Sequence, residues 1–171
     1  QVLVTLGGSA LGLRAVDLAR AIDALDRPLR IALLLGASNE LALSAARELA
    51  AHGRHPIDVH VGLTKVAQLF TRSTLAVSAA GTTCFELATL GVPGLLLIAA
   101  DNQERGGSAW SALGAFDCLG RLDEVAPRDV ATRVAKALDD RAWLESRSRC
   151  GMATVPGDGA IDFPALLGIL H

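Results

Sequence analysis

The chain has 171 residues, of which 51% are hydrophobic, and its formal net charge at pH 7 is −2. This length and apolar content suit a single domain with a full core, in which helices bury both faces of a sheet. The acidic balance and an aromatic content of 4% without tyrosine give neither a basic surface nor stacking side chains, so we expect no nucleic-acid partner.

The cysteines and the apolar runs argue against further classes of protein: disulfide-rich, zinc-binding and membrane-spanning ones. Cys84, Cys118 and Cys150 are widely spaced and form no C-x-x-C pattern, which argues against a disulfide framework or a zinc site. A reducing, cytoplasmic location is therefore the default expectation. The longest apolar run, residues 92–100, is far shorter than the roughly 18 to 20 residues of a membrane helix, so no membrane span is expected.

The first predicted strand, Val2–Leu6, leads through the turn Gly7-Gly8-Ser9 into a predicted helix over Ala10–Leu25. A dinucleotide fingerprint would need glycine in place of Ser9, and a P-loop would need a terminal Gly-Lys-Ser/Thr. The second predicted strand is followed by Asn39 and lacks the acidic residue that binds a ribose in nicotinamide enzymes. A nicotinamide-dependent oxidoreductase domain is thus the least favoured alternative.

Strands and helices continue to alternate along the chain, which predicts right-handed crossovers and a parallel sheet. The remaining strands are predicted at Leu29–Leu35, Ile57–Val61, Leu75–Ser78, Gly94–Ile98 and Phe116–Leu119. Between them we expect a helix over Asn39–Ala51, a short one at Val66–Phe70, one after each of Ser78 and Ile98, and a tail of helices Pro127–Leu138, Asp140–Arg149 and Ala160–Leu170. The tail helices are expected to pack across the edge of the sheet.

The turn after the fourth strand is the most informative segment. Gly81, Thr82 and Thr83 place two hydroxyls and free backbone N–H groups at a helix start, where a phosphate is favoured. Glu86 lies one turn inside; a carboxylate repels phosphate, so as a ligand it would accept ribose hydroxyls. The alternative is structural, because Thr83-x-x-Glu86 also fits a capping box.

A second polar turn, Asp101-Asn102-Gln103-Glu104, follows the fifth strand, at the edge where open α/β sheets bind ligands. Asp101 with Glu104 also fits a helix cap. A cap gives no reason for Asn102 and Gln103, so these two amides are candidate ligand-binding residues.

The order of these motifs, from Gly7-Gly8-Ser9 to Asp101-Asn102-Gln103, resembles the C-terminal, nucleotide-sugar-binding half of GT-B enzymes. Within that class the chain is most similar to the UDP-sugar hydrolase of pseudaminic acid biosynthesis and to spore-coat polysaccharide biosynthesis proteins. The resemblance implies a Rossmann-like three-layer α/β domain with a parallel sheet. One departure is Ala80, where the family pattern has a second glycine.

The resemblance also implies roles for the site residues. A UDP-sugar would place its diphosphate on Gly8, Ser9 and Gly81-Thr82-Thr83, its uracil near Leu63 and its ribose on Glu86, while Asn102 and Gln103 would read the sugar. Because backbone N–H groups can donate hydrogen bonds to the diphosphate, we expect no cofactor. With no Asp-x-Asp motif, Asp139-Asp140 being a bare pair, we expect no catalytic metal.

The implied activity is that of half an enzyme. A GT-B enzyme has two such domains, and residues 1–171 account for one, so an N-terminal catalytic and acceptor domain is expected outside this chain, which begins at Gln1 without methionine. A nucleotide-sugar hydrolase or a glycosyltransferase of surface polysaccharide or nonulosonic acid biosynthesis would fit, with no general base in this half. The alternative is a non-catalytic donor-binding subunit that needs a partner chain.

Overall fold

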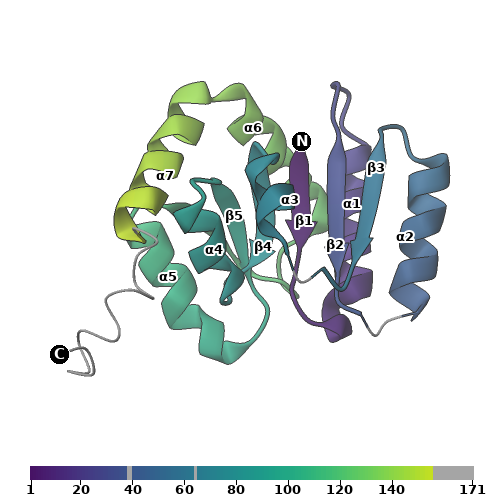
Figure 1. The fold of residues 1–171 in the computed structure, drawn as a ribbon, viewed down its shortest axis with the longest axis horizontal. Helices are drawn as coiled ribbons and strands as arrows, with labels where there is room; N and C mark the ends of the chain where they lie inside the picture. Colours follow the sequence, from purple (N-terminus) through teal and green to yellow (C-terminus); the bar gives the residue numbers. More distant parts are fainter. Residues whose placement is uncertain (38–39, 64, 156–171) are drawn as a thin grey trace.

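The computed structural model describes residues 1–37, 40–63 and 65–155, which form one six-stranded, all-parallel sheet. The strands lie in the order β3-β2-β1-β4-β5-β6, with β1 in the centre beside β4 (Figure 1). Their bounds are Val2–Thr5 for β1, Ile31–Leu35 for β2, Ile57–Val61 for β3, Leu75–Ala79 for β4, Gly94–Ile98 for β5 and Phe116–Arg121 for β6.

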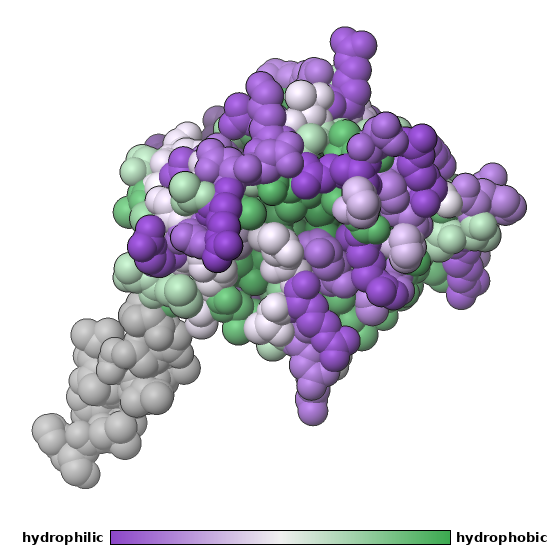
Figure 2. Space-filling view, turned by 90° about the horizontal axis from the view of Figure 1, so that it is seen from above, coloured by the Kyte–Doolittle hydropathy of each residue, from purple (hydrophilic) through white to green (hydrophobic). Residues whose placement is uncertain are grey.

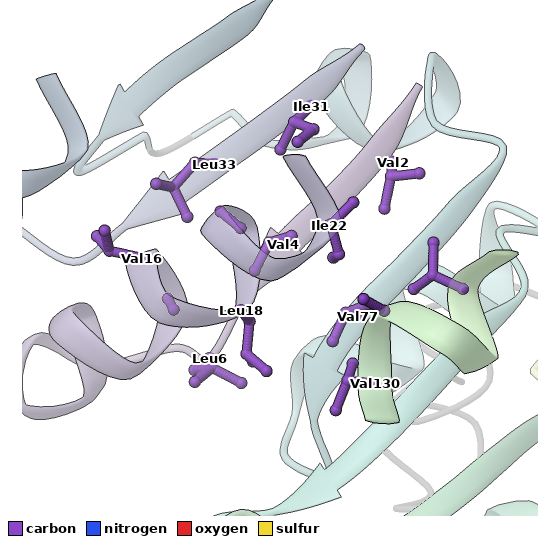
Figure 3. Packing of buried hydrophobic residues seen from close by; sticks show 14 of the residues in the cluster. Val2, Val4, Leu6, Val16, Leu18, Ile22, Ile31, Leu33, Val77 and Val130 are labelled. Atoms are coloured by element: carbon purple, nitrogen blue, oxygen red, sulfur yellow. The ribbon is translucent and has the colours of Figure 1, made fainter. Parts of the chain in front are cut away.

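One helical layer covers the first face of the sheet. It contains α1 (Gly12–Asp23), α2 (Glu40–His52) and α6 (Pro127–Asp139). Alternate strand residues such as Val2 and Val4 point into this layer, where Ile22 of α1 and Val130 of α6 are fully buried (Figure 3). The 3.6-residue period of each helix and the two-residue period of each strand thus place their apolar faces together.

The opposite face carries α3 (Ala67–Thr71), α4 (Thr83–Thr89) and α5 (Glu104–Ala112), with α7 (Arg141–Thr154) packed outside on α4. Leu3 and Ala32 point into this layer, so strands β1 and β2 are buried on both faces. Gly151 of α7 lies against Ala88 of α4, where an added Cβ would stand 3.2 Å from the Ala88 Cα. The result is a three-layer α/β sandwich.

The order of the strands fixes where a site can form. Strands β2 and β3 lie on one side of β1, and strands β4, β5 and β6 lie on its other side. The connections leaving β1 and β4 therefore diverge to opposite sides of the sheet and leave a crevice between them, at the switch point where α/β sheets bind ligands. The arrowheads of β1 and β2 in Figure 1 point to this carboxyl edge, at the bottom of that view.

The opposite, amino edge is the face shown in Figure 2, where hydrophilic side chains prevail. Here Asp23, the last residue of α1, is 7% exposed and accepts hydrogen bonds from two backbone N–H groups, those of Arg54 and His55, both at 2.9 Å. A buried carboxylate thus ties the end of α1 to the connection between α2 and β3.

All six predicted strands and the helices over the described residues are present, but their ends differ. The predicted helix Ala10–Leu25 begins as a 3-10 turn, η1 (Ser9–Leu11), and becomes α-helical only at Gly12. The predicted helix Asp140–Arg149 begins one residue later than expected, at Arg141, and continues to Thr154. Its first turn is fixed by Asp140, whose carboxylate accepts the Trp143 N–H at 2.8 Å.

The tail packs across an edge of the sheet, as predicted. Helix α6 covers a face of the sheet beside α1, and α7 lies in the opposite layer against α4. Between them, the Asp117 carboxylate of the edge strand β6 pairs with Arg133 of α6 at 3.1 Å and with Arg147 of α7 at 3.0 Å. The third predicted tail helix, Ala160–Leu170, lies outside the described residues.

Candidate functional site

Three connections meet in one cavity of about 480 Å³ at the carboxyl edge. They follow the neighbouring strands β1, β4 and β5 and come from distant parts of the sequence. The lining residues are Leu6, Gly7, Gly8, Ser78, Ala79, Ala80, Gly81, Thr82, Thr83, Phe85, Asn102, Gln103, Gly106 and Trp110. The switch point of the sheet is therefore hollow.

The turn after β4 presents its backbone to this cavity. The Ala80 N–H donates to the Leu97 carbonyl at 2.9 Å, and α4 begins three residues later, at Thr83. The N–H groups of Cys84 and Phe85 donate to the Gly81 and Thr82 carbonyls, at 3.2 and 3.1 Å, so the N–H groups just before them, those of Thr82 and Thr83, are the donors left for a ligand. The N-cap of α4 is Thr82, which makes no side-chain capping bond, and Thr83 is the first helical residue, so the alternative in which Thr83 and Glu86 form a capping box does not hold.

The turn after β5 contributes Gln103 in a fixed orientation. Its Oε1 accepts the Ala99 N–H at 2.9 Å, which leaves the Nε2 amide group as the end that faces the turn after β4. A Cβ added to Gly81 would lie 3.5 Å from that Nε2. Two turns that belong to different crossovers are thus in contact at Gln103. Asn102 is exposed beside it.

The helix cap predicted at Asp101 is not formed. This residue opens the 3-10 turn η2 (Asp101–Gln103), whose N-cap is Ala100, and its carboxylate pairs with Arg121 at 2.9 Å. The polar turn is therefore held by side-chain contacts outside the helix that follows it.

Two glycines in α5 bring this helix against the β4 turn. A Cβ on Gly107 would lie 2.9 Å from the Cys118 Sγ and 3.5 Å from the Ala80 Cβ, and Gly106 lines the cavity. Glycine inside a helix is destabilising relative to alanine, so a pair of them indicates a close approach. This signal is present in the sequence and identifies Gly106, a lining residue that the predicted motifs do not include.

Aromatic residues form the outer wall of the cavity. Phe85 is 54% exposed and meets Trp110 edge to face, with ring centroids 5.1 Å apart, and Trp110 contacts Phe116 in the same way. Trp110 itself is 6% exposed. The buried rings thus support an exposed one, which offers an apolar face to a ligand.

Glu86 lies outside the cavity, in grooves that adjoin it. One groove, of about 320 Å³, is shared with Phe85, Val66 and Leu90; the next, of about 480 Å³, is shared with Lys65 and Val66. Phe85 lines both the cavity and the first groove, so the three hollows adjoin one another in a row from the switch point toward α3, which we call the trough. The exposed Glu86 carboxylate is its acidic group.

Six of the nine predicted site residues line the cavity: Gly8, Gly81, Thr82, Thr83, Asn102 and Gln103. Ser9 begins η1 directly after Gly8. Leu63 is 41% exposed in the connection after β3, two strands from β1, and does not line the cavity. The preceding Gly62 N–H already donates to the Leu35 carbonyl, at 3.0 Å.

The lining of the cavity contains no ionised side chain among the residues described. Its polar groups are hydroxyls, amides and peptide groups. Within residues 1–37, 40–63 and 65–155, no three His, Cys, Asp or Glu residues are grouped as a metal site, and no helix is both long and apolar enough to cross a membrane. An anion bound here would interact with the dipoles of hydroxyl, amide and peptide groups.

Cys84, the second residue of α4, is fully buried beneath the turn, with its Sγ 3.5 Å from the Ala79 carbonyl oxygen. Burial raises the pKa of its thiol to about 12. The stability that this neutral thiol contributes is complete below the unfolded pKa of about 8.5 and falls as the pH rises toward the folded value.

We therefore expect N-ethylmaleimide at pH 8 to modify the half-buried Cys118 and Cys150 at least about tenfold faster than Cys84, because only the thiolate reacts. Peptide mass spectrometry after timed quenching measures each site, and the unfolded chain in urea is the control, in which all three should react alike. Equal rates in the folded chain would contradict the burial of this thiol.

No protein-family model matches the chain, and no curated protein matches its sequence. Solved structures do match. MurG of Acinetobacter baumannii is 23% identical with a TM-score of 0.70, and the match covers 88% of this chain and 44% of MurG. The spinosyn rhamnosyltransferase SpnG complexed with thymidine diphosphate is 19% identical with a TM-score of 0.66, over 96% of this chain and 44% of SpnG.

A structure of Staphylococcus aureus MnaA with UDP is similar too, at 16% identity and a TM-score of 0.64, covering 99% of this chain and 46% of MnaA. The chain thus spans less than half the length of each of these proteins. Likeness at these identities establishes the fold, and it confirms the predicted class. The chain has the Rossmann-like, three-layer fold that forms the C-terminal half of GT-B glycosyltransferases.

Proposed function

We propose that this domain binds a nucleoside diphosphate sugar, with UDP as the carrier, and serves as the donor-binding half of a glycosyltransferase or a nucleotide-sugar hydrolase. The observation that carries the proposal is the convergence of the turns after β1, β4 and β5 on one uncharged cavity at the switch point. A diphosphate is an anion that backbone N–H groups and hydroxyls can hold without a metal.

Different stretches of the trough would hold different parts of the ligand. The diphosphate would lie on Gly8, Gly81 and the hydroxyls of Thr82 and Thr83, and the nucleoside would extend past Phe85 toward Glu86, whose carboxylate would accept the ribose hydroxyls. Leu63 lines neither the cavity nor the two grooves beside Glu86, so the uracil that the resemblance implies near it would lie beyond them. Asn102, exposed at the other end, would contact the sugar.

The chemistry of such a site is loss of the nucleoside diphosphate from the anomeric carbon after attack by an acceptor hydroxyl or by water. Donors at the start of α4 would stabilise the negative charge that develops on the leaving group. The nucleophile and its general base would come from a second domain of the same protein or from a partner subunit. Surface polysaccharide or nonulosonic acid biosynthesis is the context that the sequence resemblance favours.

A nucleotide panel tests the proposal. We expect UDP to raise the melting temperature of the chain and to bind in calorimetry, while NAD does neither, because the β1 turn lacks the dinucleotide fingerprint. TDP, CMP, ADP and GDP complete the panel and rank the bases. A clear shift with NAD and none with UDP or TDP would overturn the proposed function.

The role of Glu86 has its own prediction. Glu86→Gln should weaken UDP binding about tenfold, because a charge-assisted hydrogen bond to the ribose becomes a neutral one. It should leave the affinity for 2′,3′-dideoxy-UDP almost unchanged. Calorimetry with both nucleotides gives the comparison, and Glu48→Gln, on the exposed side of α2, is the matched control. Equal losses for both nucleotides would assign Glu86 a structural role.

A further inference from the structure

We propose that Arg121 is a positioning residue of this site: it fixes the turn after β5 so that Gln103 presents its amide NH2 group, and not its carbonyl, to the phosphate-binding turn at Gly81. The inference rests on the proposed function for its ligand. Its structural part stands on the contacts of Arg121 and Gln103 alone.

Arg121 is the last residue of β6 and spans the polar turn from one side. Its Nη1 lies 2.9 Å from Asp101 Oδ1 and 2.6 Å from Glu104 Oε1, and its Nε lies 3.6 Å from Asp123 Oδ1. Asp101 and Glu104 flank Asn102 and Gln103 in the sequence. One guanidinium therefore clamps both ends of the segment that carries the two amides.

A β-bulge aims this side chain. Leu96 pairs with Cys118 and Ile98 pairs with Arg121, so two residues of β6 stand opposite one residue of β5. The extra step is taken at Gly120, whose φ of +115° is unfavourable for other residues. Because side chains alternate along a strand, one extra residue reverses the face to which residue 121 points. The bulge thus turns Arg121 toward the polar turn.

The clamp has a consequence for Gln103. With the turn held, the Ala99 N–H reaches the Gln103 Oε1 at 2.9 Å, and a carbonyl engaged in this way cannot face the cavity. The Nε2 group at the Gly81 turn can only donate. The site therefore selects a ligand atom that accepts hydrogen bonds, such as a phosphoryl oxygen, and excludes a donor at this point.

The ion pairs themselves contribute little to global stability. Asp101 and Glu104 are 89% and 54% exposed, and Arg121 is 33% exposed. Exposed pairs of this kind have small effects on unfolding. A variant that loses the clamp should therefore remain folded, which separates positioning from a general structural role.

The experiment compares Arg121→Met with Arg141→Met, which removes a similar exposed pair, Arg141–Glu145 at 2.8 Å, from α7. Amide hydrogen exchange of Ala99 is read without any ligand, and UDP affinity is read by calorimetry. In Arg121→Met we expect Ala99 to exchange at least about tenfold faster and UDP to bind about fivefold more weakly. Arg141→Met should change neither.

A double-mutant cycle and a conservative variant complete the test. In a Gln103→Ala background, Arg121→Met should cause no further loss of UDP affinity, because the group that it positions is gone. Arg121→Lys should bind UDP more tightly than Arg121→Met but less tightly than the original chain. An ammonium group can pair with the carboxylates as a point charge, but it lacks the planar set of N–H donors of a guanidinium group.

Three results would overturn the inference: unchanged Ala99 exchange in Arg121→Met, equal acceleration in Arg141→Met, or faster exchange with unchanged UDP affinity. If UDP fails to bind the original chain, the proposed function fails, and Ala99 exchange still decides whether Arg121 holds the turn.

Discussion

Gly81→Val should lower the affinity of the chain for UDP about 100-fold, or about 2.7 kcal/mol, which corresponds to one or two charge-assisted hydrogen bonds. In the free chain the new Cβ has room, since the nearest atom, Gln103 Nε2, would be 3.5 Å away. That space is the place where a diphosphate would meet the backbone, and a branched side chain would fill it. The free energy of unfolding should therefore change by less than about 1 kcal/mol.

Gly81→Ala provides the graded control. A single methyl group should cost less affinity than valine and leave urea unfolding unchanged. Calorimetric titration of all three chains with UDP gives the series. If the Gly81→Val variant bound UDP with the original affinity, the placement of the diphosphate would be contradicted. If its loss of affinity came with a loss of stability, the substitution would have disrupted the turn and not a contact with the ligand.

Asp23→Ala should destabilise the fold by about 3 kcal/mol, because two backbone N–H groups, those of Arg54 and His55, lose a charged acceptor. For a chain of this size the melting temperature should fall by about 6 to 12 °C. Affinity for UDP at temperatures where the variant is folded should be unaffected, since Asp23 lies at the amino edge of the sheet, opposite the cavity.

Asp17→Ala is the matched control on the same helix. Asp17 is exposed and pairs only loosely with Arg20, at 3.5 Å, so its removal should change stability by less than about 0.5 kcal/mol. Urea unfolding measures both variants. Equal stability losses for the two substitutions would show that the Asp23 carboxylate does not tie the helix to the connection.

The sequence predicts the strands well because each is a short apolar run between turn residues, and a parallel sheet follows from their alternation with helices. Ends of elements are less predictable. The start of α1 is an example: Ala10 favours a helix locally, but the turn after β1 tightens into a 3-10 step before the helix begins at Gly12. Such a step depends on how the chain leaves the sheet.

The site is predictable where backbone turns form it and less so where tertiary packing does. Gly81 and Gln103 belong to motifs, and the order of strands brings them together. Phe85 and Trp110 carry no motif, and they line the cavity because α5 packs closely on the β4 turn. The alternative of a helix cap at Asp101 fails for the same reason: Asp101 fits a helix start locally, but Arg121, twenty residues later, binds its carboxylate.

The uncharged lining of the cavity has a consequence for how binding responds to salt. Lysines and arginines attract an anion over long distances, and dissolved ions screen that attraction. Peptide dipoles act only at contact, so added salt has little to screen inside this cavity. The ligand's negative charges would also stay uncompensated, which makes the complex more anionic than the free chain with its net charge of −2.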